Sequence, residues 1–207
     1  MPASAVITGD IVNSTQLDED SEKRLLQRLN DILKPHKFEF YRGDSFQVYL
    51  QDSRQALEIA LKCRTAAIGL IQEAAEVVSD VRISIGIGEV ASPVLALGSA
   101  KGTAFVLSGR ALDDLEKTEG RLVIVTENPM ANLALGILTD YINSIYRQLT
   151  AKQAEVLLEL FNGETQQQVA EKLNRSKSTI SQHVTAGRWE EIEKIIKQYI
   201  NIVELLP

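Results

Sequence analysis

Hydrophobic residues recur along this chain with two different periods. In residues 81–89 every second position is apolar, from Val81 to Ile87. This period of two predicts a strand, and its other face carries Arg82, Ser84 and two glycines that leave room for a close neighbour. In residues 21–33 the leucines and the isoleucine fall at helical spacing, which predicts an amphipathic helix ended by Pro35.

The other segments complete a pattern of alternating strands and helices. We expect further strands over 5–8, 38–41, 45–50 and 121–126, and further helices over 53–78, 104–115 and 128–146. The turn Arg42-Gly43-Asp44 joins the hairpin, Asn13-Ser14-Thr15 can cap the first helix, and Ser53 can cap the second. The order predicts an α+β fold, a ferredoxin-like sandwich with its helices on one side of the sheet.

The residues after 149 have the pattern of a separate all-α domain. Thr150-Ala151-Lys152-Gln153 is a capping-box sequence in front of an apolar helix. We therefore divide the chain into residues 1–127, a connecting helix over 128–149, and a C-terminal domain over 150–207. No glycine- or serine-rich linker separates them, so we expect a tight junction.

Composition narrows the class of protein. The net charge of −6 provides no general attraction to nucleic acid or to an anionic membrane, so any DNA binding must come from a local basic face. The lone cysteine, Cys63, cannot form an internal disulfide and fits a reducing cytoplasm as a small core residue. We see neither a signal peptide nor a long apolar span, and we expect no membrane partner.

Two short loops carry the candidate chemistry of the N-terminal domain. Asp10 and Asp44 each follow an apolar, strand-like run, and Asp10 leads into a small polar loop before a helix. Carboxylates are hard ligands for Mg²⁺, and free backbone N–H groups before a helix favour phosphate. The alternative is structural, with Asp10 at a helix entry and Asp44 in a turn.

The same residues resemble the class III nucleotide cyclases over residues 5–126. Residues 9–15, Gly-Asp-Ile-Val-Asn-Ser-Thr, resemble their first metal loop, Gly43-Asp44 their second, and Leu107-Ser108-Gly109-Arg110 their phosphate-binding helix. The turn at 42–46 is also similar to that of the diguanylate cyclases. The resemblance implies a Mg²⁺ ion on Asp10, Asp44 and the Ile11 carbonyl. It also implies phosphate contacts from Asn13, Ser14, Thr15, Gly43 and Arg110.

Three positions depart from the cyclase pattern. Phe40 stands where these enzymes carry a base-selecting lysine, Ser99 where they carry its aspartate partner, and Val106 where they carry a transition-state asparagine. Ser45 replaces the acidic residue of the diguanylate cyclases. Catalysis needs groups placed where charge develops, so these losses favour ligand binding over turnover.

The C-terminal segment resembles the LuxR and sigma-region-4 type of helix-turn-helix. Helices are expected over 150–161, 165–173 and 177–184, with a small core of Val169, Ala170, Leu173, Ile180 and Val184. The outward face of the third helix would read DNA bases, and flanking basic residues would meet phosphates. The predicted DNA-binding residues are Arg175, Lys177, Ser178, Thr179, Ser181, Gln182, His183 and Arg188.

A last apolar stripe follows the helix-turn-helix. Its residues, Trp189, Ile192, Ile196, Tyr199 and Val203, alternate at spacings of three and four. One interpretation is a helix that packs on the rest of the chain. The other is a homodimer contact, which a two-fold operator would require.

These observations predict a DNA-binding transcriptional regulator whose degenerate cyclase-like domain senses a phosphorylated ligand, such as a nucleotide with Mg²⁺. A trailing helix-turn-helix on this fold also resembles the SatD-like proteins. Two alternatives stay open: an active nucleotidyl cyclase regulated by its helix-turn-helix, and a protein-interaction module in which both sites are vestigial.

Overall fold

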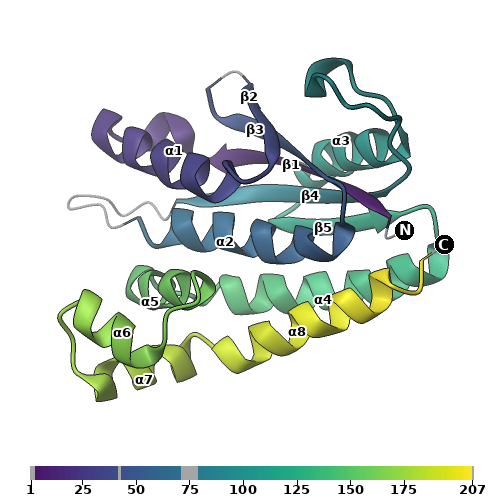
Figure 1. The fold of residues 1–207 in the computed structure, drawn as a ribbon. Helices are drawn as coiled ribbons and strands as arrows, with labels where there is room; N and C mark the ends of the chain where they lie inside the picture. The colour runs from purple at the N-terminus through teal and green to yellow at the C-terminus, as the bar shows by residue number, and fades with distance from the viewer. Residues whose placement is uncertain (1–2, 42, 71–78, 207) are drawn as a thin grey trace.

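The computed structural model describes residues 3–41, 43–70 and 79–206. Its centre is a five-stranded sheet in the order β2-β3-β1-β4-β5, in which only β4 and β5 run parallel (Figure 1). The strands are β1 (Ser4–Val12), β2 (Lys37–Tyr41), β3 (Ser45–Leu50), β4 (Asp80–Gly88) and β5 (Leu122–Thr126). The α helices are α1 (Glu19–Leu33), α2 (Ala56–Ile68), α3 (Thr103–Leu115), α4 (Pro129–Tyr146), α5 (Ala151–Phe161), α6 (Gln166–Lys172), α7 (Lys177–Ala186) and α8 (Trp189–Val203). An α/β domain followed by a helical region confirms the predicted fold class.

The expectation that all helices cover one side of the sheet was wrong. Ile83 and Ile85 of β4 enter the same core as the leucines of α1 and α2. On the opposite face, Ser84 donates to the carbonyl of Ser108 at 2.6 Å, so α3 covers that side. A Cβ atom at Gly86 would lie 2.3 Å from the Ala104 carbonyl oxygen, so glycine is what allows α3 to approach this closely. Figure 1 shows α3 and α2 on opposite sides of the sheet.

Helix α2 lies between the sheet and helices α5 and α8, while α4 packs directly on β5 and on α8 (Figure 1). A single hydrophobic cluster runs from Ala5 in β1 through α2 to Leu157 in α5 and Val203 in α8. Hydrophobic packing therefore continues from the sheet to the C-terminal helices, as expected for a tight junction between the N-terminal and C-terminal parts of the chain. The exact domain limits stay a prediction.

Several element boundaries differ from expectation because other residues provide the caps. Asp18, not Asn13 to Thr15, caps α1 by accepting from the Ser21 amide. Asp52, not Ser53, accepts from Arg54 at the start of a short 3-10 helix, η2 (Ser53–Gln55), that precedes α2. α2 ends at Ile68, and the rest of the helix predicted to Val78 falls at 71–78, outside the described residues. Among the described residues, no helix is long and apolar enough to cross a bilayer.

Candidate functional site

The structure brings the two predicted metal loops together. Asp10 lies within β1, not beyond its end as expected, and pairs across the sheet with Ser45. The Ile11 amide donates to the Asp44 carbonyl at 3.0 Å, and the Ser14 hydroxyl donates to the Asp44 carboxylate at 3.0 Å. Asp44 follows Gly43, whose φ of +90° suits a residue without a side chain. The hairpin turn and the loop after β1 are thus hydrogen-bonded to each other, and their ligand-binding role stays a prediction.

Asp10 is only partly compensated in this site. Its Oδ2 accepts from Arg82 Nη1 at 2.9 Å, while its Oδ1 is buried without a hydrogen-bond partner. Burial raises the pKa of the Asp10 carboxyl, Arg82 opposes that rise, and the charge of Asp44 adds to it. The free oxygen is therefore an acceptor suited to a further cation or donor.

The loop after β1 also has features suited to anions. Asn13 adopts a left-handed conformation (φ 60°) directly before η1 (Ser14–Gln16). Successive amides in such a left-handed-then-helical arrangement converge on one point and can hold an anion. In the described part of the chain, the amides of Asn13, Ser14 and Thr15 make no backbone hydrogen bond outside η1.

The structure does not join Arg110 to these loops. It is exposed on α3, two positions after the buried Ser108 that faces the sheet, and no hydrogen bond or ion pair of it occurs among the described residues. Its phosphate-binding role stays a prediction.

The positions that depart from the cyclase pattern have local roles. Phe40 packs edge-on against Phe38 and Phe46, Val106 is 49% exposed on α3, and the Ser99 hydroxyl donates to the Ala96 carbonyl. None of the three presents a charged group.

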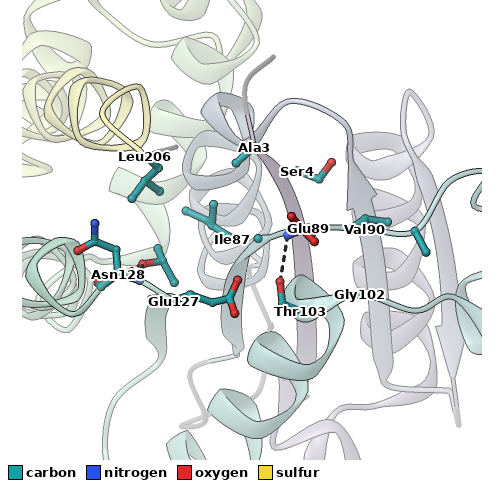
Figure 2. A pocket seen from close by; sticks show the side chains of 13 residues that line it. Ala3, Ser4, Ile87, Glu89, Val90, Gly102, Thr103, Glu127, Asn128 and Leu206 are labelled. Atoms are coloured by element: carbon teal, nitrogen blue, oxygen red, sulfur yellow. Dashed lines mark hydrogen bonds between the residues drawn. The ribbon is translucent and has the colours of Figure 1, made fainter.

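A cavity at the opposite end of β1 and β4 lies apart from these loops. It has a volume of about 860 Å³ and is lined by the ends of β4 and β5, by Gly102 and Thr103, and by Leu206 (Figure 2). In the β1–β4 pair, Ser4 and Gly88 border this cavity, whereas Asp10 and Arg82 lie near the other end. No predicted site residue lines it.

The C-terminal helices α5, α6 and α7 form a helix-turn-helix with its own small core. Val156, Val169, Ala170, Ile180 and Val184 are buried together, with Leu173 packed beside them. Thr150 and Thr165 form capping boxes, and Ser176 caps α7 by accepting from the Thr179 amide. The core and all three helices confirm the pattern predicted from the sequence.

Most predicted DNA-binding side chains gather on the open face of α7. Those exposed are Arg175, in the turn before α7, and Lys177, Ser178, Ser181 and Gln182, while Thr179 and His183 are half-buried. The Thr179 hydroxyl also contacts Ser176, so part of its hydrogen-bonding capacity is used in the cap.

Arg188 has a different environment from the α7 residues. It pairs with Glu191 at 2.6 Å and lies over the ring of Tyr141 on α4, whose hydroxyl also bonds Glu191. Those bonds lower the pKa of Glu191 to about 2. Arg188 therefore connects α8 to α4.

The stripe on α8 packs inside the chain. Ile192, Tyr199 and Val203 are buried in the main core, and Trp189 meets Phe161 of α5 with ring centroids 4.7 Å apart. This confirms the helix-packing interpretation of the stripe.

Sequence reasoning missed a group of arginines near the loop. Arg64 is buried and pairs with Asp80, while Arg121 and Arg147 share a cavity with Arg82. One local signal for this group was available in the sequence, because Arg82 is a charged residue on the non-apolar face of an alternating strand. The others depend on contacts between distant segments, which no local pattern reveals.

Comparison with known proteins finds two kinds of similarity. Residues 147–186 match the family model "Bacterial regulatory proteins, luxR family". Among solved structures, the chain is similar to a bacterial light-regulated adenylyl cyclase (11% identity, 59% of this chain, 42% of that chain, TM-score 0.38). It is also similar to the active GGEEF domain of a diguanylate cyclase from Vibrio cholerae (14% identity, 61% of this chain, 84% of that chain, TM-score 0.41). The comparison with curated proteins gives no match.

The environment of Asp10 predicts a measurable pH dependence. Because its pKa is raised above 3.8, the folded chain binds this proton more tightly than the unfolded chain. The stability of wild type relative to Asp10→Asn should therefore rise as pH falls through this raised pKa toward 3.8, the ordinary value for an aspartate. Urea unfolding across this pH range measures the free energy of unfolding of both proteins. If the difference between them stays constant or falls as pH is lowered, the pKa of Asp10 is not raised in the folded chain.

Proposed function

We propose that this chain is a transcriptional regulator that binds duplex DNA through α7 and senses a phosphorylated ligand at the Asp10–Asp44 loops. The LuxR-type helix-turn-helix carries the DNA half of the proposal, supported by the exposed polar face of α7. In this arrangement Gln182 would face a base edge and Lys177 a backbone phosphate. A cytoplasmic setting is part of the proposal.

The proposed ligand binding is supported by the Asp10 Oδ1, which has no hydrogen-bond partner in the described part of the chain and lies near the charge of Asp44. These oxygens fit a Mg²⁺ ion, which takes few carboxylates and keeps several waters. No cluster of three or more acidic, histidine or cysteine side chains that would suit a metal occurs among the described residues, so a bound ion would rely on Asp10, Asp44 and the Ile11 carbonyl with water. Such an ion supplies charge that holds phosphate oxygens.

The chain's own residues would orient the phosphates. The amides of Asn13, Ser14, Thr15 and Gly43 would donate to phosphate oxygens, and Arg110 would add a charge from α3. An apolar Phe40 and an apolar Val106 favour sensing over turnover, because neither can stabilise developing charge.

The proposal includes a homodimer, because DNA sites for helix-turn-helix proteins often have two half-sites. The α8 stripe is used internally, but α4 exposes a second one. Met130, Leu133 and Ile137 are 74%, 66% and 72% exposed at helical spacing. A second copy related by a two-fold axis would bury this α4 stripe against itself.

The DNA contacts predict two different losses. Lys177→Ala should weaken binding to all sequences and reduce the salt slope by about 1, whereas Gln182→Ala should cost about 1–3 kcal/mol at one base pair. Duplexes selected from a random pool by the wild-type chain provide the probe, and titration at several salt concentrations provides the measurement. Lys197→Ala, an exposed lysine of α8, is the control. Equal effects of all three substitutions on DNA binding would contradict the proposal that α7 is the helix that contacts DNA.

The loop site predicts Mg²⁺-dependent ligand binding. In a thermal-shift panel of nucleotides and cyclic dinucleotides, a ligand at 100 times its dissociation constant should stabilise the chain by about 2.7 kcal/mol. Asp44→Ala should remove this shift, and Asp113→Ala, an exposed aspartate of α3, should keep it. A shift retained in Asp44→Ala would place the ligand elsewhere. Product formed from the same nucleotide would favour the alternative, an active cyclase.

The α4 stripe predicts a concentration-dependent dimer. Ile137→Glu should shift the chain to monomer in light scattering, because the charge would be buried at the two-fold contact. Leu95→Glu changes a similarly exposed leucine in a loop and should have no effect. A wild-type chain that is monomeric at all concentrations, or a dimer that survives Ile137→Glu, would contradict this contact.

A further inference from the structure

A second cavity lies next to the Asp10 loop and reaches the start of the helix-turn-helix. It has a volume of about 610 Å³, and its walls come from the end of β1, the starts of β4 and β5, and the end of α4. Its charged lining residues are Arg64, Arg82, Arg121, Arg147, Asp80 and Glu119. With Asp10, which pairs with Arg82, four positive charges meet three negative ones, so the cavity keeps a positive excess in a chain whose net charge is −6.

The free positive charge in this cavity belongs to Arg121 and Arg147. Arg64 is already satisfied by Asp80 at 2.8 Å and by the Asn143 side chain at 3.2 Å. Arg121 makes one side-chain hydrogen bond, to the Gly120 carbonyl, and Arg147 makes none among the described residues. Within residues 3–41, 43–70 and 79–206, both guanidinium groups therefore keep donors free for a ligand.

Arg82 adds an unused donor at the same place. Its Nη1 is bonded to Asp10, but its Nε is buried without a partner. Burial and the charges of Arg82 and Arg64 lower the pKa of Arg121, so like charges are crowded here. A bound anion would reduce the repulsion between these arginines and would give the Arg82 Nε an acceptor.

The geometry fits a small ligand rather than a polymer. A volume of this size is typical of small-molecule sites. Guanidinium groups offer paired donors that match phosphate oxygens, and several such groups suit a ligand with more than one phosphate charge.

We propose that this cavity, which we call the arginine pocket, binds a small, multiply charged phosphate compound through Arg121, Arg147 and the Nε of Arg82. The inference rests on the proposed function, because it names the place where a phosphorylated ligand reaches the DNA-binding helices. It adds a site beside the carboxylate loops and does not need a metal ion.

The arginine pocket is connected to the helix-turn-helix by covalent structure. Arg147 caps the end of α4 and is the first residue of the luxR-family match, three residues before the capping box at Thr150. Asn143, one turn earlier, accepts from the Arg121 amide and donates to the Leu122 carbonyl. An anion held between Arg121 and Arg147 would therefore fix the end of α4 against β5 and, with it, the start of α5.

Inorganic triphosphate is a suitable probe for the arginine pocket. Calorimetric titration of the full chain in EDTA should show binding without Mg²⁺. Arg147→Gln, a change at an exposed residue that should not affect folding, is expected to weaken binding at least tenfold through the lost charge-assisted bonds. Arg121→Lys, which keeps the charge and loses the paired donors, should weaken it less. Arg24→Gln, an exposed arginine of α1, should bind like wild type.

Fluorescence of Trp189, the only tryptophan, tests whether binding in the arginine pocket affects the helix-turn-helix. Because Trp189 packs on Phe161 of α5, triphosphate should change its emission in wild type and not in Arg147→Gln.

Three results would overturn the inference: no triphosphate binding, equal binding in Arg147→Gln, or binding that requires Mg²⁺ and Asp44. The last would leave the proposed function intact. Triphosphate binding through Arg147 in a chain that binds no DNA would support the arginine pocket while contradicting the proposed function.

Discussion

The buried guanidinium of Arg64 is the interaction on which the arrangement of this molecule depends. Its side chain is 1% exposed, and such a charge is tolerated only when paired and fully hydrogen-bonded. Asp80 at the start of β4 provides a two-point contact, Asn143 on α4 accepts a third bond, and the ring of Tyr146 lies 4.6 Å from the guanidinium carbon. One side chain of α2 thus fixes the sheet and the end of α4 relative to each other. Removing Asp80 would leave an uncompensated charge in the core, and removing Asn143 would leave a buried N–H group without its acceptor.

The contacts of Arg64 help to explain why the helix-turn-helix packs against the rest of the chain. Tyr146, which also bonds Thr65 of α2, ends α4 only a few residues before α5 begins. The main core then continues into Leu157 of α5 and Tyr199 of α8, whose hydroxyl donates to the Ser53 carbonyl. Because α5 and α8 pack on α2 while α6 and α7 share a smaller core with α5, helix α7 is held in place by a scaffold that includes the sheet domain.

The sequence predicted the elements whose signals are local. The alternation of β4, the capping boxes at Thr150 and Thr165, and the small core around Val169 all depend on neighbouring residues, and the structure confirms them. The pairing of Asp10 with Arg82 and of Arg64 with Asp80 joins segments that no periodicity connects. The α8 stripe shows the same limit, since its spacing predicted a buried face but not the surface that buries it. The metal and phosphate roles of the loops, and the SatD-like resemblance, stay predictions.

Arg82 gives the two candidate sites a common electrostatic element. Its Nη1 satisfies one oxygen of Asp10, its Nε is buried without a partner among the described residues, and its positive charge acts on Arg121. A cation at Asp10 would compete with this guanidinium, and an anion beside Arg121 would attract it. Ligands that share one side chain in this way cannot bind independently. Their coupling is reciprocal, so any factor by which a cation changes the affinity for an anion must equal the factor by which the anion changes the affinity for the cation. The Asp10 loop and the end of α4 therefore form one electrostatic system, although they belong to segments more than a hundred residues apart.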